Sequence, residues 1–251
     1  MKYFSTLAAA VAATTGLVSL ATPASAQTQF IVTPDGFENT DASGISQGRP
    51  FNSAGDRFQQ IYSSDFFDGP TLITEVRFRA ANPANSFRPD AITASDSVIT
   101  FSTSQSAANA GGIAGAYDTN LGLDATVVRT GSLTLDRGGS NTSGPQPFDP
   151  GFVLDTPFLF NPALGNLLLD IFIPDAATVS ASSGFGAVED LDLVTDQPDI
   201  DGVASKTGEF GANSSGLVTQ FTGTTVAVPE PTMVAAGLLG GGLLLLRRRR
   251  D

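Results

Sequence analysis

The chain has 251 residues, and its 25 aspartates and glutamates against 13 lysines and arginines give a formal net charge of −12. It contains no cysteine and no histidine, which excludes disulfides, thiol nucleophiles, Ser-His-Asp triads and the commonest metal ligand. The negative charge repels phosphate backbones, so nucleic acid is not an expected partner.

The N-terminal residues have the pattern of a secretory signal. Lys2 begins a weakly positive stretch, and an apolar and small-residue run follows from Leu7 to Leu20. Ala24 and Ala26 flank Ser25 in the small-x-small form that signal peptidase cleaves. The pattern predicts a signal peptide over residues 1–26, removed after Ala26. The alternative is an uncleaved membrane anchor.

Residues 27–227 are predicted to form one all-β domain. In residues 72–80, Leu72, Thr74, Val76, Phe78 and Ala80 alternate with Glu75, Arg77 and Arg79. This period of two predicts a half-buried strand with the first set inside and the second set in solvent. Six further ranges show β-branched and aromatic enrichment or an apolar run: 57–62, 97–102, 125–135, 167–173, 187–194 and 217–224. Many strands separated by polar turns predict an antiparallel two-sheet β-sandwich, jelly-roll-like in type.

The aromatic residues of this domain favour a core role over an exposed sugar platform. There is no tryptophan, and the domain has only Tyr62 and Tyr117. Tyr62 is predicted at the edge of the core, with a groove beside Asp65 as the alternative. Six phenylalanines occupy predicted core positions: Phe58, Phe78, Phe101, Phe158, Phe160 and Phe172.

An acidic stretch near residues 189–201 carries the candidate metal site. Asp196, Asp199 and Asp201 supply the hard oxygen ligands that Ca²⁺ prefers, and residues 199–202 resemble part of a calcium loop. The EF-hand pattern is not met, because no glutamate follows at the required spacing. The alternative is a solvated acidic turn.

The same stretch also fits ordinary strand patterning. Asp190 and Asp192 would share one face of a strand, opposite Leu191 and Leu193. A glycosidase would need two facing carboxylates. The laminarinase-like pattern Glu-x-Asp-x-x-Glu is not completed, since Val194 stands five residues after Glu189. No catalytic residue is therefore assigned.

The C-terminal residues have the pattern of a membrane-targeting tail. Val228, Pro229, Glu230 and Pro231 precede an apolar run that ends at Leu246. The prolines favour an extended chain that an enzyme can reach. Residues 232–246 are predicted as a transmembrane helix, about 22 Å long against a hydrocarbon core of about 30 Å. A buried core helix with a basic end is the alternative.

Four arginines close the chain and are predicted to hold the end of this helix on the cytoplasmic side: Arg247, Arg248, Arg249 and Arg250. Without them, Lys2 and Asp251, the remaining 24 acidic and 8 basic residues give a net charge near −16. Such a charge favours a soluble domain outside the membrane.

Together, the Val-Pro-Glu-Pro motif, the apolar helix and the arginine cluster resemble the sorting signal of bacterial PEP-CTERM proteins. The resemblance covers residues 228–251 and the generic signal peptide. It implies processing by an exosortase near the motif. It further implies a precursor tethered to the inner membrane, then delivery to the cell surface or extracellular matrix of a Gram-negative-type bacterium.

The PEP-CTERM family shares this tail and no common activity, so the role of residues 27–227 rests on their own composition. The expected function is a structural or adhesive surface protein that meets extracellular polysaccharide. A calcium-dependent glycan-binding module is the alternative, and a polysaccharide-active enzyme is the third candidate.

Overall fold

The computed structural model describes residues 27–42, 44–45, 53–81, 91–109, 111–113, 115–136, 144–181, 191–194, 203–207, 210–213 and 215–226. The predicted signal peptide and the predicted sorting tail lie outside these ranges. In the described ranges no helix has the length and apolar character needed to cross a membrane.

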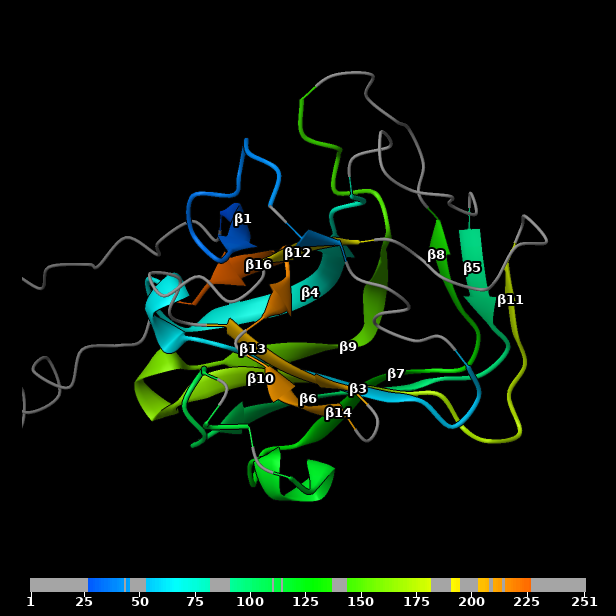
Figure 1. Ribbon diagram of the computed structural model, residues 1–251. Coiled ribbons are helices and arrows are strands. Elements are labelled where there is room, and N and C mark those ends of the chain that lie inside the picture. Colours follow the sequence, from blue (N-terminus) through cyan, green and yellow to red (C-terminus); the bar gives the residue numbers. More distant parts are fainter. Residues whose placement is uncertain are drawn as a thin grey trace, which may run out of the picture.

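The described chain is all-β, and every sheet is antiparallel (Figure 1). The four-stranded sheet has the order β1 (Thr28–Thr33), β16 (Thr219–Thr225), β4 (Thr71–Phe78) and β9 (Gly151–Phe160). The six-stranded sheet has the order β14 (Phe210–Asn213), β13 (Val203–Thr207), β3 (Arg57–Tyr62), β10 (Asn166–Phe172), β6 (Val98–Ser104) and β7 (Thr126–Thr130).

Smaller elements complete the fold. One three-stranded sheet has the order β11 (Val179–Ala181), β5 (Ala91–Ala94) and β8 (Leu133–Asp136). The other has the order β15 (Gly216–Leu217), β12 (Asp192–Val194) and β2 (Gly44–Ile45). Short 3₁₀ helices lie in the connections: η1 (Ser64–Phe66), η3 (Tyr117–Asn120) and η4 (Pro162–Leu164).

Aromatic rings from the two larger sheets meet in the main core. Tyr62 on β3 packs edge-on against Phe221 on β16, with ring centroids 4.9 Å apart. Phe101 on β6 contacts both Phe158 on β9, at 5.6 Å, and Phe221, at 6.2 Å. These rings join the buried faces of the two sheets into one apolar cluster.

The strands predicted from the apolar runs are confirmed where the run is regular. Residues 57–62 form β3, and all of the run 167–173 except Ile173 lies in β10, which is in the middle of its sheet between β3 and β6. The predicted strand 125–135 is in fact two strands, β7 and β8, in different sheets. Gly131, at φ +91°, turns the chain between them.

Two burial predictions for the core face are wrong. In β4 it is Ile73 that is buried, while Leu72 and Thr74 are half-exposed. Against β16, Ile73 and Glu75 pair with the consecutive residues Gly223 and Thr222, so Thr74 is the extra residue of a β-bulge, which reverses the alternation before Val76. Phe172 is 36% exposed, because it points to the outer face of the six-stranded sheet. The other five phenylalanines that were predicted at core positions are buried.

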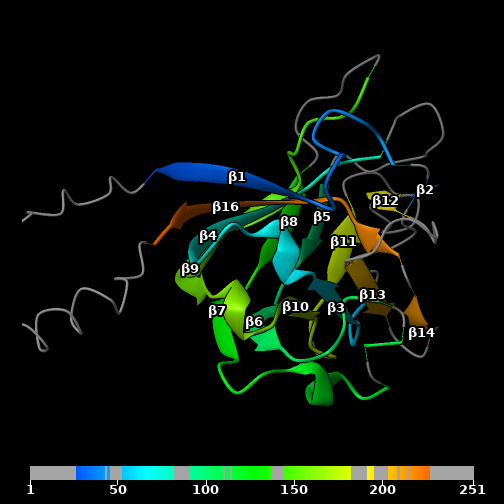
Figure 2. The ribbon, with the colours of Figure 1, turned by 90° about the vertical axis from the view of Figure 1, so that its left-hand side faces the viewer.

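Both ends of the described domain lie at one pole, which we call the tether pole. It consists of the η1 loop (63–70), the η4 loop (161–165), residues 105–106 and 121–124, and Val226. The η1 loop joins the end of β3 to the start of β4, and the η4 loop joins the end of β9 to the start of β10. Thr28 of β1 pairs with Thr224 of β16, so the first and last strands run side by side (Figure 2). The backbone N–H of Val226 donates to the carbonyl of Pro70 at 2.8 Å.

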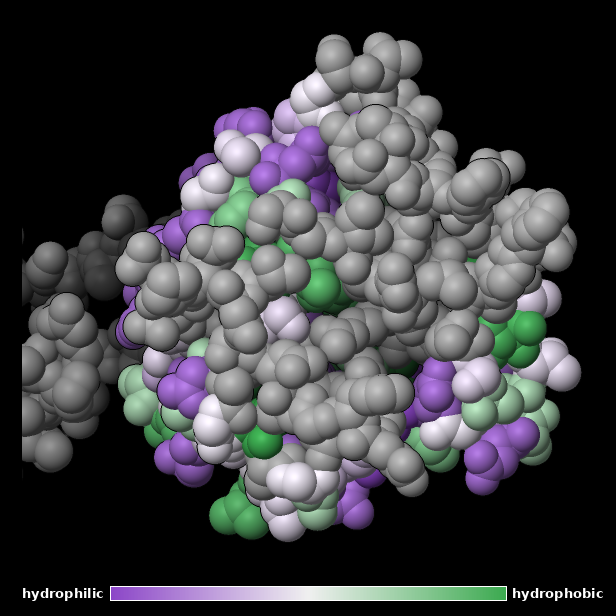
Figure 3. Space-filling model, viewed as in Figure 1, coloured by the Kyte–Doolittle hydropathy of each residue, from purple (hydrophilic) through white to green (hydrophobic). Residues whose placement is uncertain are grey.

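The described surface is mixed in polarity. On the face seen in Figure 3, apolar residues form small groups among hydrophilic ones. Exposed apolar side chains therefore bear on function only where several of them lie at the same place in the fold.

Candidate functional site

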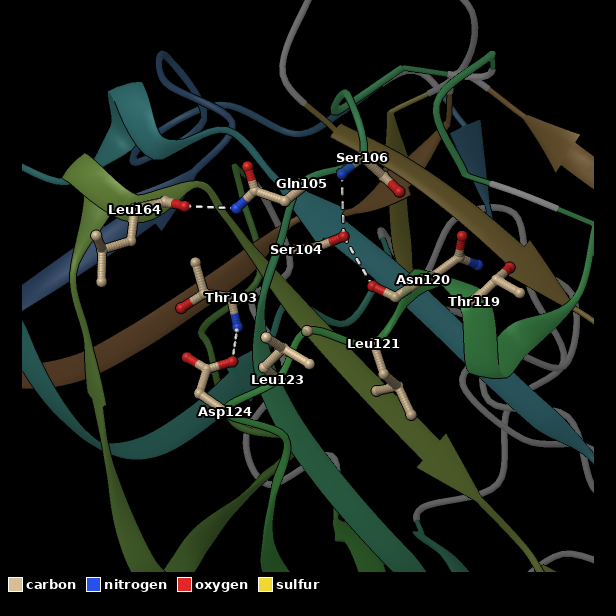
Figure 4. A pocket seen from close by; sticks show the side chains of 11 residues that line it. Thr103, Ser104, Gln105, Ser106, Thr119, Asn120, Leu121, Leu123, Asp124 and Leu164 are labelled. Atoms are coloured by element: carbon tan, nitrogen blue, oxygen red, sulfur yellow. Dashed lines mark hydrogen bonds between the residues drawn. The ribbon is translucent and has the colours of Figure 1, made fainter.

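A groove of about 710 Å³ opens at the tether pole, between the end of β6 and the η4 loop (Figure 4). Its walls mix hydroxyl, amide and leucine side chains. The lining residues are Thr103, Ser104, Gln105, Ser106, Thr119, Asn120, Leu121, Gly122, Leu123, Asp124 and Leu164.

Hydrogen bonds fix the shape of this groove. Gln105 Nε2 donates to the Leu164 carbonyl at 2.6 Å, which ties β6 to the η4 loop. The backbone N–H of Thr103 donates to Asp124 Oδ1 at 2.7 Å. A Cβ on Gly122 would lie 1.9 Å from the Thr103 carbonyl oxygen, so only glycine allows the loop to approach β6 this closely.

A polar network on the outer face of the six-stranded sheet continues from this groove. Ser104 Oγ donates to the Asn120 carbonyl at 2.7 Å, and Asn120 Nδ2 donates to Gln59 Oε1 at 2.8 Å. Gln59 Nε2 in turn donates to Asp170 Oδ2 at 2.8 Å. Residues 117–120 therefore cover this face partly through polar contacts between buried side chains.

Arg57 ends the network on the side away from the tether pole. Its Nε donates to both Asp170 oxygens, at 3.0 and 3.1 Å, and its Nη1 donates to Asp118 Oδ1 at 2.8 Å. Burial lowers the pKa of Arg57, but the hydrogen bonds and charges of Asp170 and Asp118 outweigh it, and the net shift is upward. Arg57 also lies over the Tyr117 ring, 5.0 Å from its centroid.

A second arginine, Arg79, is fully buried at 1% exposure, although the sequence pattern placed it in solvent. Its Nη2 donates to the Glu38 carbonyl at 2.9 Å, and its Nη1 donates to the Thr40 carbonyl. The guanidinium lies 4.3 Å from the centroid of the Phe148 ring. Its Nε has no hydrogen-bond partner in the described part of the chain. Arg79 therefore fastens residues 38–40 onto the outer face of the four-stranded sheet.

Asp192 is the acidic partner of Arg79, with Nη1 and Oδ2 3.7 Å apart. Its two carboxylate oxygens accept the backbone N–H of Ala42 at 3.0 and 2.9 Å. Burial raises the pKa of Asp192 to about 6, against the lowering effects of the Ala42 hydrogen bond and the Arg79 charge. Burial also lowers the pKa of Arg79, and the charge of Asp192 only partly offsets this.

The strand pattern predicted around Asp192 is therefore only half right. Leu191 and Leu193 are buried as expected, but Asp192 is 1% exposed rather than solvated. Alternation shows that Asp192 faces away from the leucines. It does not show that Arg79 and Ala42 cover that second face.

The site residues predicted from the sequence lie outside the described ranges. These are Ala24 and Ala26 of the signal, Val228, Pro229, Glu230 and Pro231 of the motif, Arg247, Arg248, Arg249 and Arg250 of the tail, and Asp196, Asp199 and Asp201 of the acidic stretch. Within the described ranges no group of three or more acidic side chains is placed to hold a metal ion.

Comparison of the sequence with protein-family models and with curated proteins gives no match.

Proposed function

We propose that this protein is an exported surface or extracellular-matrix component with a structural or adhesive role. Its body is a two-sheet, jelly-roll-like β-sandwich over residues 27–227. A signal peptide takes it across the inner membrane of a Gram-negative-type bacterium, and the tail 228–251 holds it there until an exosortase acts near Glu230.

The observation that carries the proposal is the pairing of the first and last strands. Thr28 lies opposite Thr224, so the described chain begins and ends at the tether pole, one residue after Ala26 and three residues before Pro229 in the sequence. The signal peptide exports the N-terminal end of the domain, and the tail anchors its C-terminal end. Because both ends lie at one pole, the domain can then fold on the membrane surface without a strand having to cross the domain.

The described ion pairs support a structural role for the body. Asp170 and Asp192 are buried, and each is held by an arginine and a further hydrogen-bond donor. Carboxylates engaged in this way hold neighbouring segments of the chain in a fixed arrangement, which is a structural task.

Mass spectrometry of the cell-surface fraction tests the proposal. The wild-type chain should begin at Gln27 and lack Arg247–Arg250, and a chain deleted for residues 229–251 should not reach the surface in the same form. Glu230→Ala should accumulate as tailed precursor, whereas Asp155→Ala, a change at an exposed acidic residue of the body, should be processed normally. A surface form that still carries Arg247–Arg250 would contradict the proposal.

The groove favours glycan binding as the second candidate function, because hydroxyl and amide side chains line it beside leucines. Calcium would then bind at Asp196, Asp199 and Asp201. This candidate requires that Ca²⁺ raises the melting temperature, and that Asp199→Ala and Asp201→Ala abolish the shift. No response to Ca²⁺ would remove the calcium-dependent form of this candidate.

A further inference from the structure

Exposed leucines gather at the tether pole. Leu123 is fully exposed and Leu164 is 61% exposed, and the two stand on different loops at the groove. Val226, the last described residue, is 38% exposed at the same pole. Single exposed leucines are ordinary on a protein surface, but these two line one groove at the same pole as the end of the described chain.

The length of the chain beyond Val226 limits what this pole can face. Residues 227–231 separate Val226 from the predicted membrane helix at Thr232. Six steps of extended chain span at most about 20 Å. Val226, and Pro70 of the η1 loop that its N–H contacts, therefore lie within about 20 Å of the start of the predicted helix while the tail is in the bilayer.

We propose that the tether pole rests on the membrane surface in the tethered precursor, with Leu123 and Leu164 inserted at the level of the headgroups. The inference rests on the proposed function, since it requires the tail to be embedded in the membrane. It adds a second contact, made by the folded domain itself, that the sorting motif does not supply.

The charge of the pole indicates what kind of membrane contact this is. Its loops carry Asp65, Asp68 and Asp124 and no lysine or arginine. Contact therefore depends on apolar insertion, and anionic lipids repel it. A contact of this kind is weak without the tail, so the domain leaves the membrane once the tail is cut.

The absence of cysteine allows a direct test on the full chain. Leu123→Cys, Leu164→Cys and Thr130→Cys each give one site for an environment-sensitive fluorophore. Thr130 is the matched control, because it is exposed and pairs with Val98 at the opposite end of the six-stranded sheet. The labelled chains are reconstituted in phosphatidylcholine vesicles that carry a lipid-bound quencher.

The labels at residues 123 and 164 should be quenched from the lipid several-fold more than the label at residue 130. Replacing part of the phosphatidylcholine with phosphatidylglycerol should weaken this quenching, and deleting residues 229–251 should abolish it. Equal exposure of all three labels to aqueous iodide would overturn the proposal.

A fourth label separates this inference from the proposed function. Leu243→Cys lies in the predicted helix and should be quenched from the lipid whether or not the pole touches the membrane. If the label at residue 243 is quenched and those at 123 and 164 are not, the tail is embedded but the pole contact is wrong. If residue 243 stays accessible to iodide, the tail assignment itself fails. Labels at 123 and 164 that are shielded only in native membranes would indicate a protein partner, and would also count against a lipid contact.

Discussion

The protein contains two arginine–aspartate pairs that differ in their surroundings. Arg57 and Asp170 make close contacts on the outer face of the six-stranded sheet, where the Arg57 side chain is 24% exposed. Arg79 and Asp192 stand 3.7 Å apart in a fully buried position beside the four-stranded sheet. The first pair raises the pKa of its arginine, whereas burial of the second lowers that of Arg79 and raises that of Asp192.

The difference shows that the burial of an ion pair decides how much the pair contributes to the stability of the fold. Removing two charges from water is costly, and only close, fully hydrogen-bonded geometry offsets the cost. Arg57 keeps part of its hydration and has two carboxylate partners. Arg79 instead depends on carbonyls and an aromatic ring, and it joins segments far apart in the sequence.

Breaking the more deeply buried pair, Arg79 and Asp192, should reduce the stability of the fold most. Arg79→Met should lower the free energy of unfolding by about 3–5 kcal/mol at pH 8, because it leaves the Asp192 carboxylate buried without its cation. Residues 38–40 would also lose their two hydrogen bonds to the guanidinium. Urea denaturation followed by circular dichroism measures the change.

Arg57→Met is the matched control for this substitution. It should cost less, because the Arg57 side chain is 24% exposed and water can take its place beside Asp170, whereas the Arg79 side chain is 1% exposed. If the two variants lose equal stability, depth does not distinguish the pairs.

The stability of the fold should depend on pH through Asp192. The pKa of Asp192 is about 6 in the folded chain against an ordinary value of 3.8, so the folded state binds this proton more tightly than the unfolded state. The stability linked to it is complete below pH 4 and is lost as the pH rises through 6. The free energy of unfolding should therefore fall by about 2 kcal/mol between pH 4 and pH 7 on account of this group.

Asp192→Asn removes this titration and should flatten the fall in stability, as measured by urea denaturation across the pH range. Asp155→Asn, at an exposed carboxylate, should leave the slope as it is. An unchanged slope in Asp192→Asn would show that Asp192 titrates near its ordinary pKa.

The sequence predicted much of the sheet structure, because local alternation determines which side of a strand is apolar. It predicted the core positions of Phe58 and Phe101 and the strand that forms β10. It could not predict the β-bulge before Glu75, because a bulge depends on the neighbouring strands.

The candidate site was less predictable. Alternation placed Arg79 and Asp192 away from the apolar core, which is correct, but the residues that cover them come from positions 38–42 and 148. Nor does any local pattern bring residues 103–106, 121–124 and 164 around one groove. The strand order does so, by placing the ends of β6 and β9 at the same pole.

The Asp170 carboxylate should contribute less to stability than the deeper pair does. Asp170→Asn removes the charge that Arg57 contacts and leaves Gln59 Nε2 facing an amide. Asp118 still binds the guanidinium, so the free energy of unfolding should fall by only about 2 kcal/mol, as measured in urea at pH 7. A loss as large as that of Arg79→Met would mean that the contact with Asp118 contributes little.

Tyr117 contacts both the backbone and the side chain of Arg57, and changes at Tyr117 should reduce stability least. Tyr117 Oη donates to the Arg57 carbonyl at 2.8 Å, while its ring lies under the guanidinium. Tyr117→Phe keeps the ring and removes only the hydroxyl, so it should cost about 1 kcal/mol. Tyr117→Leu also removes the cation–π contact, which adds about 0.5–1 kcal/mol at a partly exposed site.

Measured in urea in the Arg57→Met background, the difference in stability between the two Tyr117 variants should shrink, because no cation remains above the ring. A difference that persists there would assign the effect of the ring to packing against η3 rather than to the charge of Arg57.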